Sequence, residues 1–167
     1  MLRAASHRPG IGIGQATMSL AALHNDRFGI VTTLDPPVPL IAANVTACGH
    51  QQACVGIVAA GVPMLKVKDD EQDVEDRLAM IIAGLEAAGA GAIILGCAGI
   101  SGFCQGLSRR TAAALIDGVM AVALVAQTFA GPSSSDCVAN PDKKSSREMV
   151  TRFWTRCQAV AIGEETP

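Results

Sequence analysis

Apolar runs typical of buried strands alternate along this chain with segments of helical periodicity. Strands are predicted at 28–33, 53–58, 93–95 and 113–116, and the glycine-rich segment 10–14 predicts a further short strand and turn. Helices are predicted at 15–25, 38–48, 70–88, 102–111 and 119–130. Because strands and helices alternate, the sequence predicts an α/β fold, a Rossmann-like parallel sheet of about four strands with crossover helices.

The clearest helix is the one over 70–88, which begins with an acidic first turn. Its apolar positions recur at helical spacing and form one face, made of Val74, Leu78, Ile81, Ile82 and Leu85. The helix leads directly to the apolar strand Ile93-Ile94-Leu95, which ends at Gly96-Cys97. Further along, Asp117-Gly118 follows the next strand and predicts a turn and helix cap.

The composition changes after residue 130. The predicted α/β domain covers 9–130, whereas 131–146 (GPSSSDCVANPDKKSS) is typical of a linker. Helical periodicity returns over 147–162, with an apolar stripe opposite three arginines. This amphipathic C-terminal helix has three possible settings: docking on the chain's own sheet, a homo-oligomer contact, or a membrane surface.

Composition excludes several classes of function. The 167 residues are 50% hydrophobic and 17% charged with a net charge of −2, which suits one folded domain and gives no attraction to nucleic acid. No apolar run reaches the roughly 20 residues of a membrane span, and no signal peptide is predicted. The six cysteines lack the paired spacing of a zinc site. We expect reduced thiols in a cytoplasmic protein.

Cys97 is the main candidate for chemistry. It follows a buried strand, and the carboxyl ends of parallel strands are where open α/β sheets bind ligands. The small residues Ala98 and Gly99 come next, so the amino end of a following helix would stabilise a thiolate and a developing oxyanion. The alternative is a buried structural cysteine, because cysteine behaves as a small hydrophobe.

Two further loops are predicted at the same edge of the sheet. Thr32 and Thr33 follow one strand, and Gly14 and Gln15 follow the 10–14 segment, so hydroxyls, an amide and open backbone are expected to converge near the thiol. The threonine pair also suits helix capping. The glycines do not complete a dinucleotide-binding fingerprint, which makes nucleotide binding a weak alternative. None of the three histidines is predicted near this edge, which argues against a cysteine hydrolase.

Several segments, in order and spacing, resemble the aspartate/glutamate/hydantoin racemase superfamily, in particular its hydantoin and allantoin racemase branch. These segments are Gly-Ile-Gly-Gln-Ala (12–16), Arg-Phe-Gly-Ile-Val-Thr-Thr-Leu (27–34), Ala-Gly-Val-Pro (60–63), Leu-Gly-Cys-Ala-Gly (95–99) and Ile-Asp-Gly-Val (116–119). The resemblance implies two similar α/β lobes facing each other across a cleft, each contributing one catalytic cysteine. It implies no metal or organic cofactor and a small-molecule substrate.

The resemblance assigns roles to particular residues. It implies that Cys97 is the catalytic cysteine of the second lobe and that Thr32, Thr33, Ala98 and Gly99 hold polar groups of the substrate. Gly14 and Gln15 are further substrate-binding candidates. Gln15 departs from the family, whose members commonly carry glutamate there.

A second departure concerns the first lobe, which the resemblance places before Gly10, where only nine residues stand. We therefore expect a lone second lobe, from a truncated product, an incomplete gene model or a paralogue, with weak or no racemase activity by itself. Cys104 is badly placed to act as the opposite acid. The alternatives are a non-catalytic lobe that binds a small carboxylate or ureide or pairs with a partner, and a thiol redox module.

Overall fold

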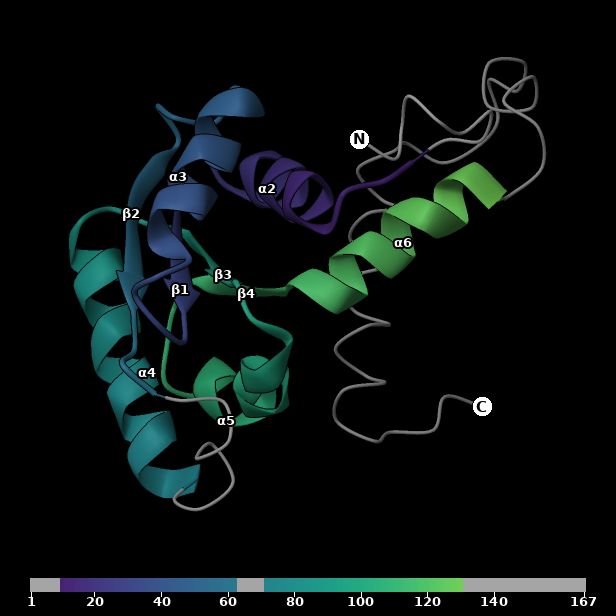
Figure 1. The fold of residues 1–167 in the computed structure, drawn as a ribbon. Coiled ribbons are helices and arrows are strands. Elements are labelled where there is room, and N and C mark those ends of the chain that lie inside the picture. The colour runs from purple at the N-terminus through teal and green to yellow at the C-terminus, as the bar shows by residue number, and fades with distance from the viewer. Residues whose placement is uncertain (1–9, 63–70, 131–167) are drawn as a thin grey trace, which may run out of the picture. The chain divides into compact units, whose positions relative to one another are not determined.

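A computed structural model describes residues 10–62 and 71–130 (Figure 1). Contacts divide the chain into two units, 1–129 and 130–167, and the fold described here belongs to the first. Its elements are α2 (Ile13–His24), β1 (Phe28–Thr32), α3 (Val38–Ala47), β2 (Cys54–Ala59), α4 (Glu71–Ala87), β3 (Ala92–Leu95), η2 (Ala98–Phe103), α5 (Cys104–Ser108), β4 (Ala114–Asp117) and α6 (Gly118–Ala130). The predicted linker over 131–146 and C-terminal helix over 147–162 lie outside the described residues.

The four strands form one parallel sheet in the order β2-β1-β3-β4. Ile30 of β1 stands opposite Ile57 of β2 and Ile94 of β3, and Ile94 stands opposite Ile116 of β4. All residues of β1 and β3 are buried, as expected for central strands that are apolar on both faces. The predicted α/β fold, with a parallel four-stranded sheet and crossover helices, is confirmed.

Helices cover both faces of the sheet. Successive side chains of a strand point to opposite faces, and Ile93 and Leu95 join a core cluster with Leu78 and Leu85 of α4. Ile94 lies on the other face, which α2 covers. The apolar face predicted for α4 faces the core: Val74, Leu78, Ile82 and Leu85 are buried, and Ile81 is partly buried against the same cluster.

Gly29 explains how closely α4 approaches the sheet. A Cβ atom at this position would lie only 2.8 Å from Leu85 Cδ1 and 3.1 Å from Leu85 Cβ. Carbon atoms in contact normally lie about 3.5–4.0 Å apart. The absence of a side chain at the second residue of β1 therefore lets Leu85 pack directly on the strand.

Two sequence predictions are wrong in detail. The predicted strand at 10–14 is not formed: residues 10–12 lie outside any strand, and α2 begins at Ile13, two residues earlier than expected. The amide of Ala16 donates to the Gly12 carbonyl over 2.9 Å, so this glycine caps a helix. The predicted helix over 102–111 is replaced by η2 and α5, which begin directly after Cys97 and end at Ser108.

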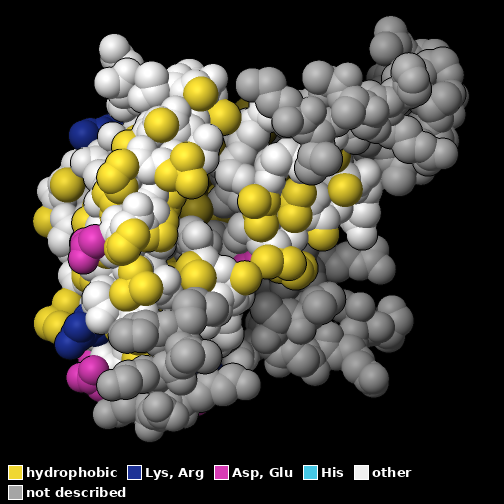
Figure 2. Space-filling model, in the orientation of Figure 1, with side chains coloured by type: hydrophobic (Ala, Val, Ile, Leu, Met, Phe, Trp, Pro, Cys, Tyr) yellow, Lys and Arg dark blue, Asp and Glu magenta, His cyan; other side chains and the backbone are white. Residues whose placement is uncertain are grey.

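One face of the fold carries exposed apolar side chains. Figure 2 shows hydrophobic side chains spread over the region of α3 and α6. Leu40 on α3 and Val119 and Met120 on α6 are among the exposed large hydrophobic residues. No helix within 10–62 and 71–130 is both long enough and apolar enough to cross a membrane.

Candidate active site

Cys97 lies at the carboxyl edge of the sheet, two residues after β3 ends. It is half-buried and has extended backbone angles (φ −138°, ψ 129°) as the N-cap of η2. The carbonyl of Cys97 accepts the first hydrogen bond of η2, from the amide of Ile100 over 3.1 Å. The first amides of such a helix have no partner within it, so the N–H groups of Ala98 and Gly99 make no hydrogen bond inside η2.

The geometry at Gly96 brings Cys97 to this edge. A Cβ atom on Gly96 would lie 3.1 Å from the carbonyl oxygen of Val31 and 3.2 Å from Ile30 Cγ2. Both distances are shorter than ordinary contacts, so a residue with a side chain would push β1 and β3 apart. The amide of Gly96 also donates to the Val31 carbonyl over 2.8 Å. The glycine thus holds the end of β3 against β1 immediately before the thiol.

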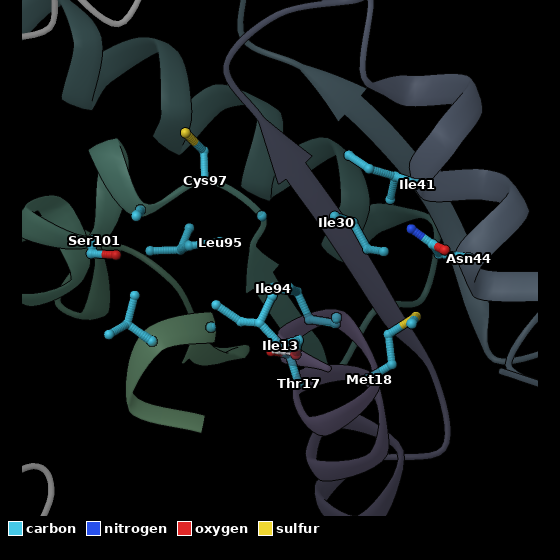
Figure 3. Close-up of a pocket in the computed structure, with 15 residues that line it drawn as sticks. Ile13, Thr17, Met18, Ile30, Ile41, Asn44, Ile94, Leu95, Cys97 and Ser101 are labelled. Carbon is cyan, nitrogen blue, oxygen red and sulfur yellow. Dashed lines mark hydrogen bonds between the residues drawn. The ribbon is translucent and has the colours of Figure 1, made fainter. Parts of the chain in front are cut away.

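A pocket of about 130 Å³ lies beside Cys97 (Figure 3). Its walls come from α2, β1, α3, β3, the segment 96–101 and the start of α6, and the lining residues are Ile13, Gly14, Thr17, Met18, Ile30, Ile41, Asn44, Ile94, Leu95, Gly96, Cys97, Ala98, Ser101, Gly118 and Val119. The lining is mostly apolar with a few polar groups, as is typical of sites for small organic molecules. Among these residues Cys97 has the only ionisable side chain.

Figure 3 shows how the polar residues lie around this pocket. The Cys97 side chain extends away from Ile13 and Ile94, and it packs against the core cluster that contains Leu95 and Ile100. The hydroxyl of Thr17 is buried and donates to the Ile13 carbonyl over 2.7 Å, so its hydrogen bond is made within α2. Asn44 and Ser101 are the remaining polar side chains of the lining.

The structure brings together only part of the predicted site. Gly14 and Ala98 line the pocket with Cys97. Thr32 and Thr33 are 2% and 4% exposed and lie outside the lining, and their carbonyls accept hydrogen bonds from Ala60 and Val62. Gln15 is exposed on α2, and Gly99 lies within η2, both also outside the lining. Substrate binding by these residues stays a prediction.

Sequence reasoning missed three polar residues of the pocket. Thr17, Asn44 and Ser101 come from three elements that are far apart in the sequence. Asn44 stands in a largely apolar helical segment whose other polar residue is Thr46, and this was the only available signal. Ser101 sits in Ala-Gly-Ile-Ser-Gly-Phe, where nothing distinguishes a pocket residue from a turn.

Cys104 differs chemically from a catalytic thiol. Burial, together with the negative charge of Asp117, raises the pKa of Cys104 to about 11. The Asp117 carboxylate also accepts hydrogen bonds from the amides of Val119 (2.7 Å) and Met120 (2.9 Å). This confirms the predicted helix cap at the start of α6. Cys104 therefore stays protonated near neutral pH and is poorly suited to remove a proton.

No group of three metal-binding side chains occurs within the part of the chain that the structure describes. What the fold and site define is an α/β domain with a thiol at the carboxyl edge of a parallel sheet, beside a small, mostly apolar pocket. The model of one family, Asp/Glu/Hydantoin racemase, matches residues 1–126. The chain belongs to the Asp/Glu/hydantoin racemase family.

Individual relatives agree with this membership. The chain is 38% identical over 124 residues to a hydantoin racemase of Rhizobium meliloti, a match that covers 74% of this chain and 52% of the relative. It is 30% identical over 131 residues to a hydantoin racemase of Pseudomonas sp. (strain NS671), covering 76% and 51%. The chain spans about half the length of these curated relatives.

Solved structures give the same answer for the fold. The allantoin racemase from Pseudomonas fluorescens matches with a TM-score of 0.69 at 27% identity, covering 82% of this chain and 60% of that one. The allantoin racemase from Klebsiella pneumoniae matches with a TM-score of 0.67 at 31% identity, covering 81% and 58%.

Proposed function

We propose that this chain takes part in cofactor-independent racemisation of a small cyclic ureide of the hydantoin or allantoin type. Cys97 is the acid/base that moves the proton at the carbon next to a carbonyl. The observation that carries the proposal is the position of Cys97 as the only ionisable side chain of the pocket lining, directly before the first amides of η2. Family membership and the names of the relatives support this substrate class over others.

The chemistry needs only a proton transfer. The Cys97 thiolate takes the hydrogen on the substrate carbon as a proton, and the electron pair of that C–H bond moves into the adjacent carbonyl to give an enolate. Amides of Ala98 and Gly99, at the start of η2, stabilise the negative charge on the enolate oxygen. Returning a proton to the same carbon completes the exchange.

Inversion of configuration needs an acid on the opposite face of the carbon. The pocket lining supplies none besides Cys97, and Cys104 lies outside that lining. The relatives that act as racemases are about twice as long as the matched region. We therefore propose that this chain alone exchanges the substrate proton faster than it inverts the carbon, so that its racemase activity is weak.

Solvent exchange tests the proposal. Single enantiomers of allantoin, 5-substituted hydantoins, aspartate and glutamate are incubated in D₂O, and loss of the Cα–H signal is followed by NMR against a blank without protein. Exchange of a ureide by the wild-type chain is expected to disappear in Cys97→Ser. The control Cys48→Ser alters the half-buried thiol at the C-cap of α3, outside the pocket lining, and should retain exchange. Equal exchange by wild type and Cys97→Ser would overturn the catalytic role.

A second candidate function is ligand binding without turnover. The single ionisable group of the pocket lining favours it, because a two-base reaction lacks its second base there. In that case the wild-type chain binds allantoin or a hydantoin without exchanging its proton, and Cys97→Ser binds the same ligand equally well. Calorimetry and the exchange experiment on the same samples separate the two functions.

A further inference from the structure

Asn44 places an accessible amide in the wall of the pocket that Cys97 also lines. It lies in the interior of α3, one turn after Ile41, and both residues belong to the lining. Asn44 is exposed, and its side chain makes no hydrogen bond with the residues that the structure describes. Figure 3 shows the amide directed toward Ile30, another residue of the lining. The amide is therefore open to a molecule that enters the pocket.

The other polar side chains of the lining are closed off or already engaged. Thr17 is buried, and its hydroxyl donates to the Ile13 carbonyl. The oxygen of Ser101 is buried and has almost no accessible surface. Cys97 has the proposed role of acid/base. Asn44 is thus the side chain of the lining that is best placed to hold polar groups of a ligand by hydrogen bonds.

The structure of α3 gives no reason for an asparagine at this position. Asparagine is less favourable than alanine inside a helix, because its side chain competes with the backbone for hydrogen bonds. The other polar residue of the helix, Thr46, bonds to its own backbone: its hydroxyl donates to the Ala42 carbonyl over 3.2 Å. Asn44 makes no such bond with a described residue. A ligand in the pocket would give its amide a partner.

We propose that Asn44 is a substrate-binding residue that orients a ureide ring through a pair of hydrogen bonds. Its amide nitrogen donates to a ring carbonyl, and its amide oxygen accepts from the adjoining ring N–H. The ligand class rests on the proposed function. A ureide ring carries C=O and N–H groups side by side, and a primary amide presents the complementary donor and acceptor. A carboxylate offers acceptors only and would leave the amide oxygen unpaired.

Replacing Asn44 should change binding without loss of stability. Asn44→Ala removes both hydrogen bonds, so the dissociation constant of hydantoin should rise by roughly two- to tenfold. The unliganded variant should melt at the same temperature or higher, because alanine favours a helix. The matched control Thr46→Ala changes the other polar residue of α3, which lies outside the pocket lining, and should bind hydantoin as the wild type does.

Methylated ligands test the hydrogen-bond pair itself. Calorimetry measures the binding of hydantoin and of its two N-methyl derivatives to the wild-type chain, Asn44→Ala and Thr46→Ala. A methyl group on the ring nitrogen that faces Asn44 removes the N–H donor. Its effect on the dissociation constant should be roughly two- to tenfold larger in the wild type than in Asn44→Ala. If Asn44 acted only through the fold of α3, methylation would have the same effect in both proteins.

Two results would overturn the assignment of Asn44: unchanged hydantoin binding by Asn44→Ala, or equal effects of both methyl groups in the wild type and Asn44→Ala. Proton exchange that disappears in Cys97→Ser would still uphold the proposed function in either case. Absence of ureide binding by the wild type would remove both this inference and the proposed function. The expected dependence on Asn44 and on the N–H group, together with exchange that survives in Cys97→Ser, would overturn only the catalytic role.

Discussion

Replacing Gly29 by alanine tests how tightly α4 is packed on the sheet that carries Cys97. The new Cβ would lie 2.8 Å from Leu85 Cδ1, 3.1 Å from Leu85 Cδ2 and 3.1 Å from Leu85 Cβ. Overpacking of a buried site typically costs about 1–3 kcal/mol, and the fixed Leu85 Cβ leaves little room for escape. We expect Gly29→Ala to lower the free energy of unfolding by about 1–3 kcal/mol.

Urea denaturation followed by circular dichroism measures this change, with Gly84→Ala as the matched control. A Cβ atom at Gly84 would meet nothing within 4 Å, and Gly84 lies in the interior of α4. Alanine is better than glycine in a helix, so Gly84→Ala should raise the free energy of unfolding by about 0.5–1 kcal/mol.

A double mutant separates the contact with Leu85 from other effects. In a Leu85→Ala background the atoms Cδ1 and Cδ2 are gone, and the penalty of Gly29→Ala should shrink. Gly29→Ala as stable as the wild type, or an equal penalty in both backgrounds, would refute the packing argument.

Two further predictions concern α6 and the second thiol. Asp117→Ala removes the acceptor for the amides of Val119 and Met120. The free energy of unfolding, measured by urea titration, should fall by about 0.5–2 kcal/mol. A smaller change would contradict the role of Asp117 as a helix cap. The pKa of Cys104 is raised from 9.0 to about 11. Between these pH values the folded protein therefore keeps the thiol proton that the unfolded chain has lost. Stability should therefore fall as the pH rises from 9 to 11, and less steeply in Cys104→Ala; identical slopes would argue against the raised pKa.

The sheet was predictable because its central strands are buried on both faces. A continuous apolar run such as Ile93-Ile94-Leu95 is typical of a strand that is buried on both faces. The periodic apolar positions of α4 then indicate which face of that helix packs on the sheet. The segment 10–14 was misread because alternating glycines imitate the period of a strand, although glycine has no side chain to bury. The local sequence pattern therefore predicted the elements correctly where apolar side chains mark the buried face of a strand or helix.

Of the candidate site residues taken from the sequence, Cys97, Ala98 and Gly14 line the pocket. A residue at the end of a central strand has a position fixed by topology, which is why Cys97 and Ala98 were found. Thr32 and Thr33 end a central strand too, but their side chains are buried. Asn44 and Ser101 reach the pocket through packing of α3 and η2 on the sheet, which no local pattern records.

The ratio of proton exchange to inversion tests the central claim most directly. One enantiomer of allantoin is incubated with the chain in D₂O, and deuterium at the stereocentre and optical rotation are followed in the same sample against a blank. The account predicts deuterium incorporation that exceeds inversion for the wild type, and neither above the blank for Cys97→Ser. Incorporation that persists in Cys97→Ser would contradict the account of Cys97 as the acid/base of this site.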